Sequence, residues 1–230
     1  MKTIAIIPSG GVGSRFLSSI PKQYVKVLGK ELIYYTLNVF QQCDLIDEII
    51  IPAQPEYFDL LKGLKAKYNL TKISKVIKGG KERQHSVFNA LNSVKPEAND
   101  LVVVHDAARP LLSPELLQKA IKFAHKSDSI VVAIKARDTL LKAKDNTVES
   151  YLDRNNIYYV QTPQIFRYRI LIDAFNKANN THFLATDESM LVKNNNTKVN
   201  ILEGESSNFK ITTQSDIRLF ESIIRLRTSN

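Results

Sequence analysis

Short runs of consecutive apolar residues alternate along the chain with segments in which apolar residues recur every three or four positions. Apolar runs rich in valine and isoleucine are typical of parallel strands that are buried on both faces of a sheet. They predict strands over Thr3–Ile7, Glu48–Ala53, Lys75–Gly79, Asp100–Asp106 and Ser129–Lys135.

Helical periodicity fills the segments between these strands. It predicts helices over residues 31–40, 55–68, 85–94 and 113–126, and the last of these has Ser113 as its N-cap and Pro114 in its first turn. This alternation of strands and helices predicts an α/β fold, with a mainly parallel sheet that is flanked by helices on both faces.

The pattern changes after Lys135. Residues 136–160 have no helical period, and we expect them to form an arm of two extended segments around the polar turn KDNT. Further on, helices are expected over 167–179 and 186–194, strands over 198–204 and 208–213, and a last helix from about Thr213. Thr186 is the expected N-cap of the second of these helices, and Asp216 is the expected capping partner of Thr213. We predict a single domain over residues 1–230, with the arm inside it.

Composition narrows the class of protein. Of the 230 residues, 43% are hydrophobic and 24% charged, as in ordinary globular domains. No apolar run approaches the about 18 residues of a membrane span, and the strand-like start lacks the features of a signal peptide, so we expect a cytoplasmic protein. The single cysteine, Cys43, agrees with a reducing compartment, and the four histidines lack metal-ligand spacing.

The formal net charge of +9 favours an anionic partner. The sequence has no obvious platform of aromatic residues interleaved with arginine, of the kind that single-strand binders use. We therefore expect small phosphorylated molecules as partners, and neither nucleic acid nor a membrane.

A glycine-rich stretch, IIPSGGVGSRF, follows the first predicted strand. It is not a dinucleotide fingerprint, because Phe16 stands where the third glycine is needed, and no Walker lysine follows. Consecutive glycines let backbone N–H groups face an anion, while Arg15 and Lys22 add positive charge. By itself the stretch is about as consistent with a plain glycine turn.

Two further loops follow predicted strands. GGKERQHSV, residues 79–87, places Ser86 in the first turn of a helix, and VVVHDAARP, residues 102–110, ends a strand with Asp106 and Arg109. Ligands of open α/β sheets lie beyond the carboxyl ends of the strands, where an aspartate is well placed for Mg²⁺. Taken singly, these loops also fit an ordinary turn and a capping aspartate.

In combination the motifs are specific. The chain carries, in this order, S-G-G-x-G-x-R with P-K-Q-Y, G-G-x-x-R-x-x-S-V, H-D-A-A-R-P, R-D-T, D-R-N, Q-T-P-Q-x-F, T-D-E and N-F-K-I-T. It resembles the 2-C-methyl-D-erythritol 4-phosphate cytidylyltransferase family over nearly its whole length. The resemblance implies a Rossmann-like nucleotidyltransferase fold, the use of CTP and Mg²⁺, and a role in non-mevalonate isoprenoid biosynthesis.

The resemblance also implies roles for individual residues. Arg15, Lys22 and Lys210 would be catalytic, holding the triphosphate and stabilising charge at the α-phosphorus. The residues implied for nucleotide binding are Ser9, Gly10, Gly11, Gly13, Gly80, Lys81, Ser86 and Asp106, the last of which would also lie near the metal. The residues implied for the sugar-alcohol phosphate are Arg109, Thr139, Arg154, Thr162 and Thr186. In this family the arm reaches across a homodimer, so Thr139 and Arg154 would serve the neighbouring subunit's site.

The implied reaction needs no general base, because a phosphate monoester is already ionised at neutral pH. Two departures from the family pattern keep an alternative open. Ser9-Gly10-Gly11 replaces the usual A-A-G, and Leu141 stands where D-T-x-K has lysine. The alternative acceptor is ribitol 5-phosphate, although H-D-A-A-R-P favours methylerythritol phosphate. A more remote alternative is a non-catalytic protein that binds nucleotides or polyanions.

Overall fold

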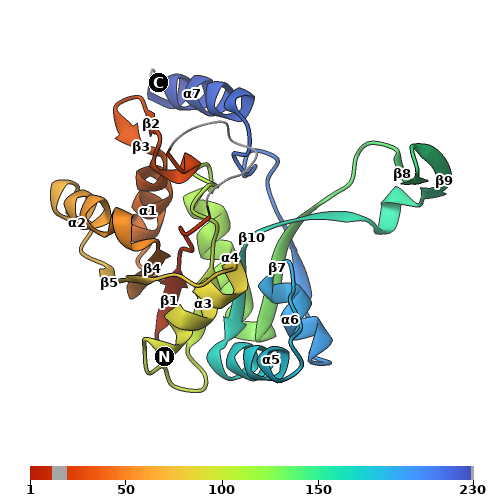
Figure 1. Ribbon diagram of the computed structural model, residues 1–230, viewed down its shortest axis with the longest axis horizontal. Helices are drawn as coiled ribbons and strands as arrows, with labels where there is room; N and C mark the ends of the chain where they lie inside the picture. Colours follow the sequence, from red (N-terminus) through yellow and green to blue (C-terminus); the bar gives the residue numbers. More distant parts are fainter. Residues whose placement is uncertain (12–19, 229–230) are drawn as a thin grey trace.

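A seven-stranded sheet forms the centre of the computed structural model, which describes residues 1–11 and 20–228 (Figure 1). The strands are β1 (Thr3–Ile6), β4 (Glu48–Ala53), β5 (Ile73–Lys78), β6 (Leu101–Val104), β7 (Ser129–Lys135), β10 (Tyr158–Arg167) and β11 (Asn200–Glu203). Their spatial order is β11-β7-β10-β6-β1-β4-β5. Only β10 runs antiparallel to its neighbours among these described strands. The predicted, mainly parallel α/β fold is confirmed, but β10 was not foreseen as a member of this sheet.

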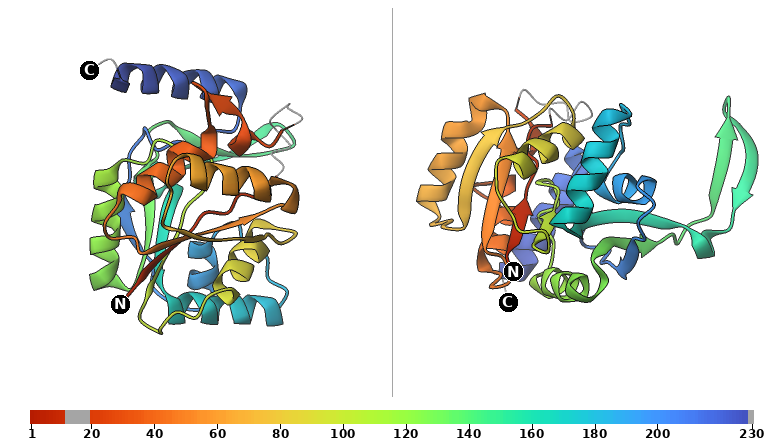
Figure 2. Two further views of the ribbon diagram at one scale, coloured as in Figure 1. Left: turned by 90° about the vertical axis from the view of Figure 1, so that its left-hand side faces the viewer. Right: turned by 90° about the horizontal axis from the view of Figure 1, so that it is seen from below.

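Helices cover both faces of the sheet (Figure 2). They are α1 (Leu32–Gln42), α2 (Phe58–Lys67), α3 (Arg83–Asn92), α4 (Pro114–Ser127), α5 (Tyr168–Asn180), α6 (Glu188–Asn194) and α7 (Gln214–Thr228). One core joins the sheet to α1, α2 and α4, and the other joins it to α3, α5 and α6. Inside the described ranges, none of the helices has the length and hydropathy of a membrane span.

Shorter elements complete the described chain. They are the 3₁₀ turns η1 (Lys22–Tyr24), η2 (Pro55–Tyr57) and η3 (Arg154–Asn156), and the two-stranded ribbons β2 (Lys26–Val27) with β3 (Lys30–Glu31) and β8 (Leu140–Lys144) with β9 (Thr147–Leu152).

Side chains at the helix N-termini explain where the helices begin. The Ser113 hydroxyl accepts a hydrogen bond from the Leu116 N–H at 3.0 Å, which confirms it as the cap of α4. The Asp216 carboxylate accepts bonds from the N–H groups of two residues just before α7, as expected. The prediction of Thr186 as the cap of α6 was wrong. Asp187 fills that position because its carboxylate accepts from the Met190 N–H at 2.8 Å.

The predicted strand over residues 208–213 was also wrong. Its apolar residues Phe209 and Ile211 pack in a third cluster beneath α7 instead of joining a sheet. The Ile211 N–H donates to the Ala108 carbonyl at 2.8 Å, which ties this irregular segment to the loop after β6. The alternating apolar side chains are buried by packing against α1 and α7, and the segment does not pair with a strand.

The chain between β7 and β10 forms an arm in which β8 and β9 are antiparallel to one another. Residues 158–160, which we expected in the arm, instead belong to β10 and pair with β7 in the main sheet. Asp145 and Asn146 make the turn between β8 and β9 with positive φ values of 49° and 60°, a conformation that these residue types tolerate. The arm leaves the sheet from β7, returns into β10 and projects away from the rest of the chain (Figure 1).

Candidate active site

A cavity of about 680 Å³ opens beyond the carboxyl ends of β1, β4, β5 and β6. This is the edge at which ligands bind in open α/β sheets. Its wall contains Gly10 and Gly11 after β1, Gln54 after β4, Gly79–Arg83 after β5 and Asp106–Ala108 after β6. Lys22 and Lys210 enter the same cavity from opposite ends of the sequence. The topology therefore joins loops that are far apart in the chain.

The first glycine loop is held from below by two buried side chains. Gln23 donates from Nε2 to the carbonyls of Ser9 and Gly11, at 2.7 and 3.0 Å. The Tyr24 hydroxyl lies 2.7 Å from the Ser9 hydroxyl, and the Tyr24 ring stacks on Tyr57 at 4.1 Å. Burial raises the pKa of Tyr24 to about 12, so its hydroxyl stays neutral. Gln23 and Tyr24 directly follow Lys22 in η1, so their contacts with Ser9 and Gly11 hold the backbone at Lys22 close to the first glycine loop.

The second glycine loop turns tightly into α3. The Gly80 N–H donates to the Ser86 hydroxyl at 2.9 Å, and a Cβ added at Gly80 would overlap the Cβ of His85. Glu82 and His85 form a reciprocal capping box at the start of the helix. Glycine is thus required at position 80 by the close approach of its own helix.

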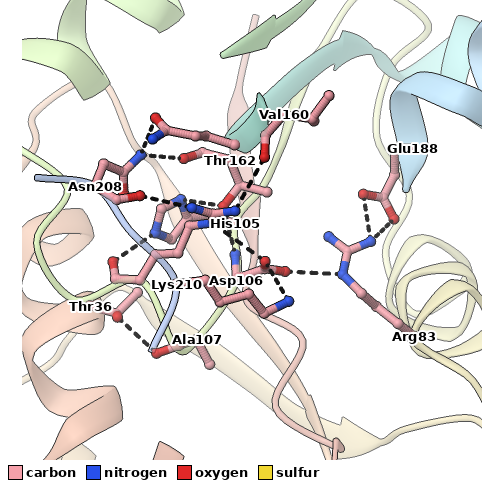
Figure 3. A network of polar contacts seen from close by, with 12 residues as sticks. Thr36, Arg83, His105, Asp106, Ala107, Val160, Thr162, Glu188, Asn208 and Lys210 are labelled. Carbon is pink, nitrogen blue, oxygen red and sulfur yellow. Dashed lines mark hydrogen bonds and ion pairs between the residues drawn. The ribbon is translucent and has the colours of Figure 1, made fainter. Parts of the chain in front are cut away.

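Asp106 lies where three cations meet (Figure 3). Its carboxylate is 3.0 Å from Nε of Arg83, 2.9 Å from Nζ of Lys210 and 3.6 Å from Nε of Arg109. Burial disfavours the charged carboxylate, but these cations outweigh burial and hold the pKa of Asp106 well below its usual range. Asp106 is therefore an anion at neutral pH.

The segment before Lys210 is anchored to β10. Asn208 is fully buried and donates to the Thr162 carbonyl at 2.8 Å, while its own carbonyl accepts from Arg109 at 2.8 Å. The Thr162 hydroxyl in turn accepts from the Asp106 N–H at 3.1 Å. These bonds place Lys210 beside the carboxylate of Asp106.

His105 is fully buried and faces away from the cavity. Its ring nitrogens lie 3.1 Å from the Arg109 carbonyl and 3.0 Å from the Thr162 hydroxyl. Burial lowers the pKa of His105 to about 4, so the ring is neutral at physiological pH. It braces the Asp106–Arg109 turn and does not reach the space that a substrate would occupy.

The predicted site residues fall into four groups. Those that line the cavity are Gly10, Gly11, Lys22, Gly80, Lys81, Ser86, Asp106 and Lys210. Those that are buried next to it are Ser9, Arg109 and Thr162. The exposed residues outside its wall are Thr139, Arg154 and Thr186. Gly13 and Arg15 lie outside the described residues.

Sequence reasoning assigned no role to several residues that shape the site. The quoted motifs contain these residues, so the sequence did mark them as candidates. They are Gln23, Arg83, Glu188 and Asn208. Arg83 donates from Nε to Asp106 and from Nη1 to both carboxylate oxygens of Glu188, at 2.7 and 2.8 Å. A pairing across 105 positions leaves no local pattern in the sequence, which is why this link was not found.

The donor set bears on how a metal ion would be held. No cluster of three or more histidine, cysteine, aspartate or glutamate side chains suited to a metal is present among the described residues. Asp106 nevertheless offers a carboxylate at the cavity wall. Mg²⁺ commonly takes one or two carboxylates, together with waters and substrate phosphates. These residues fit an ion that binds with a nucleotide, and not one caged by protein ligands alone.

The arrangement suits binding of a polyanion and stabilisation of developing negative charge. Two lysines and backbone groups of glycine loops surround a space large enough for a nucleotide. Because neither the neutral, buried His105 nor the ion-paired Asp106 is a free base, the geometry favours transfer chemistry in which the nucleophile is already ionised.

Comparison with known proteins gives a consistent result. The family model for 2-C-methyl-D-erythritol 4-phosphate cytidylyltransferase matches residues 3–226. Proteins of that name from Clostridium botulinum and Syntrophus aciditrophicus are 35% and 38% identical to this chain. The first alignment covers 99% of both chains, and the second covers 97% of this chain and 96% of the relative.

A crystal structure of 4-diphosphocytidyl-2C-methyl-D-erythritol synthase from Anaerococcus prevotii superposes with a TM-score of 0.85 at 30% identity, covering 97% of this chain and 96% of that one. The fold, the cavity at the carboxyl edge of the sheet and a match over nearly the whole chain agree. This chain belongs to the 2-C-methyl-D-erythritol 4-phosphate cytidylyltransferase family.

Proposed function

We propose that the chain transfers CMP from CTP to 2-C-methyl-D-erythritol 4-phosphate, with release of pyrophosphate, in the synthesis of isoprenoid precursors. Family membership over residues 3–226 supports this activity. The structural observation that carries it is the meeting of Lys22, Asp106 and Lys210 around one cavity. A protein that only bound polyanions would not need a buried carboxylate paired with one of the two lysines.

In the proposed reaction a phosphate oxygen of the acceptor attacks the α-phosphorus of CTP, and the bond from that phosphorus to the bridging oxygen of pyrophosphate breaks. The main task of the protein is to hold two mutually repelling anions in line. Backbone N–H groups at Gly10 and Gly11 would face phosphate oxygens, while Lys22 and Lys210 would stabilise the charge that accumulates at the α-phosphorus.

Lys210 has to exchange partners for this to occur. Its ammonium group is paired with Asp106 at 2.9 Å, although about two fifths of the side chain is exposed to the cavity. An arriving α-phosphate would compete for the ammonium group, and Arg83 and Arg109 would remain to compensate Asp106. Mg²⁺ bound with CTP would neutralise part of the phosphate charge, and we propose Asp106 as its protein ligand.

The arm supports a homodimer in which each subunit completes the acceptor site of the other. Thr139 and Arg154 are exposed, do not line the cavity and belong to the arm, which projects away from the sheet and helices of its own chain (Figure 2). Exposed apolar side chains at Leu141, Val148 and Tyr151 offer a surface for a second copy. The free, buried thiol of Cys43 agrees with the reducing cytoplasm that we propose as the location.

Pyrophosphate release tests the activity directly. We expect turnover with CTP, Mg²⁺ and 2-C-methyl-D-erythritol 4-phosphate, and little with ribitol 5-phosphate, because the family and the relatives described above are those of the methylerythritol enzyme. A preference for ribitol 5-phosphate would reject the acceptor. Tight CTP binding without pyrophosphate release from any sugar-alcohol phosphate would support a binding protein instead.

A further inference from the structure

A buried ion pair joins α6 to the wall of the nucleotide cavity. Glu188 is the first residue of α6 and is 0% exposed. Both of its carboxylate oxygens accept from Nη1 of Arg83, at 2.7 and 2.8 Å (Figure 3). A fully buried carboxylate is costly unless it is paired, so this contact determines where the guanidinium group of Arg83 lies.

The same guanidinium group continues the chain of contacts to the cavity. Arg83 Nε donates to Oδ1 of Asp106 at 3.0 Å, and Oδ2 of Asp106 holds Lys210 at 2.9 Å. Burial opposes the charge on Arg83, but Glu188 and Asp106 raise its pKa above the ordinary value. The Arg83 side chain is therefore a charged bridge with a carboxylate on each side.

The contact between Glu188 and Arg83 connects two distant parts of the chain. Thr186, which the family resemblance connects with the acceptor, lies two residues before Glu188. Arg83, Asp106 and Lys210 all line the cavity. The contact between Glu188 and Arg83 thus links the start of α6 to the carboxylate of Asp106 and the ammonium group of Lys210 at the cavity wall.

We propose that Glu188 is a positioning residue, which holds Arg83 so that Asp106 and Lys210 are oriented for CTP. This inference rests on the proposed function and names a residue to which neither the sequence motifs nor the comparisons give a role. Glu188 is fully buried and does not line the cavity. Its effect passes through the guanidinium group of Arg83, and losing it would leave that group free to shift away from Asp106.

The test uses Glu188→Gln, which keeps the shape of the side chain but removes its charge and leaves one amide oxygen to accept. Because a misplacement far from the chemistry can cost ~100-fold in rate, we expect kcat/KM to fall ~10- to 100-fold. We also expect the Kd for CTP, measured by calorimetry in the presence of Mg²⁺ and the absence of acceptor, to rise ~10-fold. Glu188→Asp, which keeps the charge on a shorter side chain, should restore part of both losses.

Asp128→Asn is the matched control, since Asp128 holds another arginine, Arg167, at 2.9 Å and does not line the cavity. It should lower the melting temperature and leave the Kd for CTP unchanged. A double-mutant cycle with Arg83→Gln shows whether Glu188 acts through Arg83. In the Arg83→Gln background, Glu188→Gln should have almost no further effect on the Kd for CTP.

Several outcomes would overturn the inference. One is an unchanged Kd for CTP and kcat/KM in Glu188→Gln. Another is a double variant in which the effects of Glu188→Gln and Arg83→Gln on the Kd for CTP simply multiply, as they do for residues that act independently. If Glu188→Gln does not fold, a wild-type Kd for CTP in Arg83→Gln would refute the positioning role, because Arg83 is the group through which Glu188 acts. Failure of the wild-type protein to bind CTP would instead reject the proposed function, and this inference would fall with it.

Discussion

Replacement of Lys210 by alanine separates catalytic charge from structural charge. Lys210 forms an ion pair, 2.9 Å long, with Asp106, whose side chain is only 10% exposed. Removing it does not leave Asp106 uncompensated, because Arg83 remains at 3.0 Å and Arg109 at 3.6 Å.

Lys210→Ala should have a small effect on the free energy of unfolding and a large effect on turnover. Lys210 is 39% exposed, so solvent screens the pair, and its loss should lower the free energy of unfolding by about 1 kcal/mol or less. For a chain of this size that corresponds to a fall in melting temperature of about 2–4 °C. Loss of a preorganised charge at the reacting phosphorus should reduce turnover ~100-fold or more, which is about 2.7 kcal/mol of transition-state stabilisation.

The assay pairs pyrophosphate release at saturating CTP with a thermal melt of the same preparation. Lys26→Ala is the matched control, because Lys26 lies 3.8 Å from the mostly buried carboxylate of Glu31 and does not line the cavity. It should change the melting temperature by a similar small amount and leave turnover as in the wild type. A Lys210→Ala protein that loses melting temperature and turnover in step would refute the catalytic role.

Three further predictions concern His105, Gln23 and the arm. Burial lowers the pKa of His105 to about 4 from 6.5, so neutral His105 contributes stability above pH 6.5 that is lost as the pH falls toward 4. His105→Gln should remove about 3 kcal/mol of that pH dependence in urea unfolding, and an unchanged slope would contradict it. Gln23→Glu puts a carboxylate against the carbonyls of Ser9 and Gly11 and should raise the Kd for CTP ~10-fold in calorimetry, whereas wild-type affinity would show that the clamp is dispensable. Tyr151 is 69% exposed on the arm, and Tyr151→Asp should shift the sedimentation coefficient from that of a dimer toward that of a monomer. A wild-type protein that sediments as a monomer would contradict the proposed dimer.

Local patterns predicted much of the framework. Runs such as those of β4 and β7 are short, rich in valine and isoleucine and almost wholly apolar, which is typical of a strand buried on both faces, and their bounds agree with the prediction. Caps were predictable where the side chain bonds to a backbone group three residues away, as at Ser113. The cap at Thr186 failed because the adjacent Asp187 competes for the same role.

The irregular segment around Lys210 shows the limit of such reasoning. Its alternating apolar residues have the period of a strand, but α1 and α7 provide the surface that buries them. The strand β10 was similarly hidden, since an antiparallel strand inserted between two parallel ones depends on which edges of the sheet are free. Neither outcome depends on neighbouring residues in the sequence.

The sequence alone determined the α/β class, the loops that follow strands and the identity of the residues that carry charge, because each of these depends on local composition and on order along the chain. The family resemblance implied that Lys22 and Lys210 act at one site, and both line the cavity. Only the tertiary structure decided that Arg83 bridges Asp106 to Glu188. Contacts between residues a hundred positions apart arise from the strand order of the sheet, and the Coulomb interactions that define the site depend on distances that no local pattern encodes.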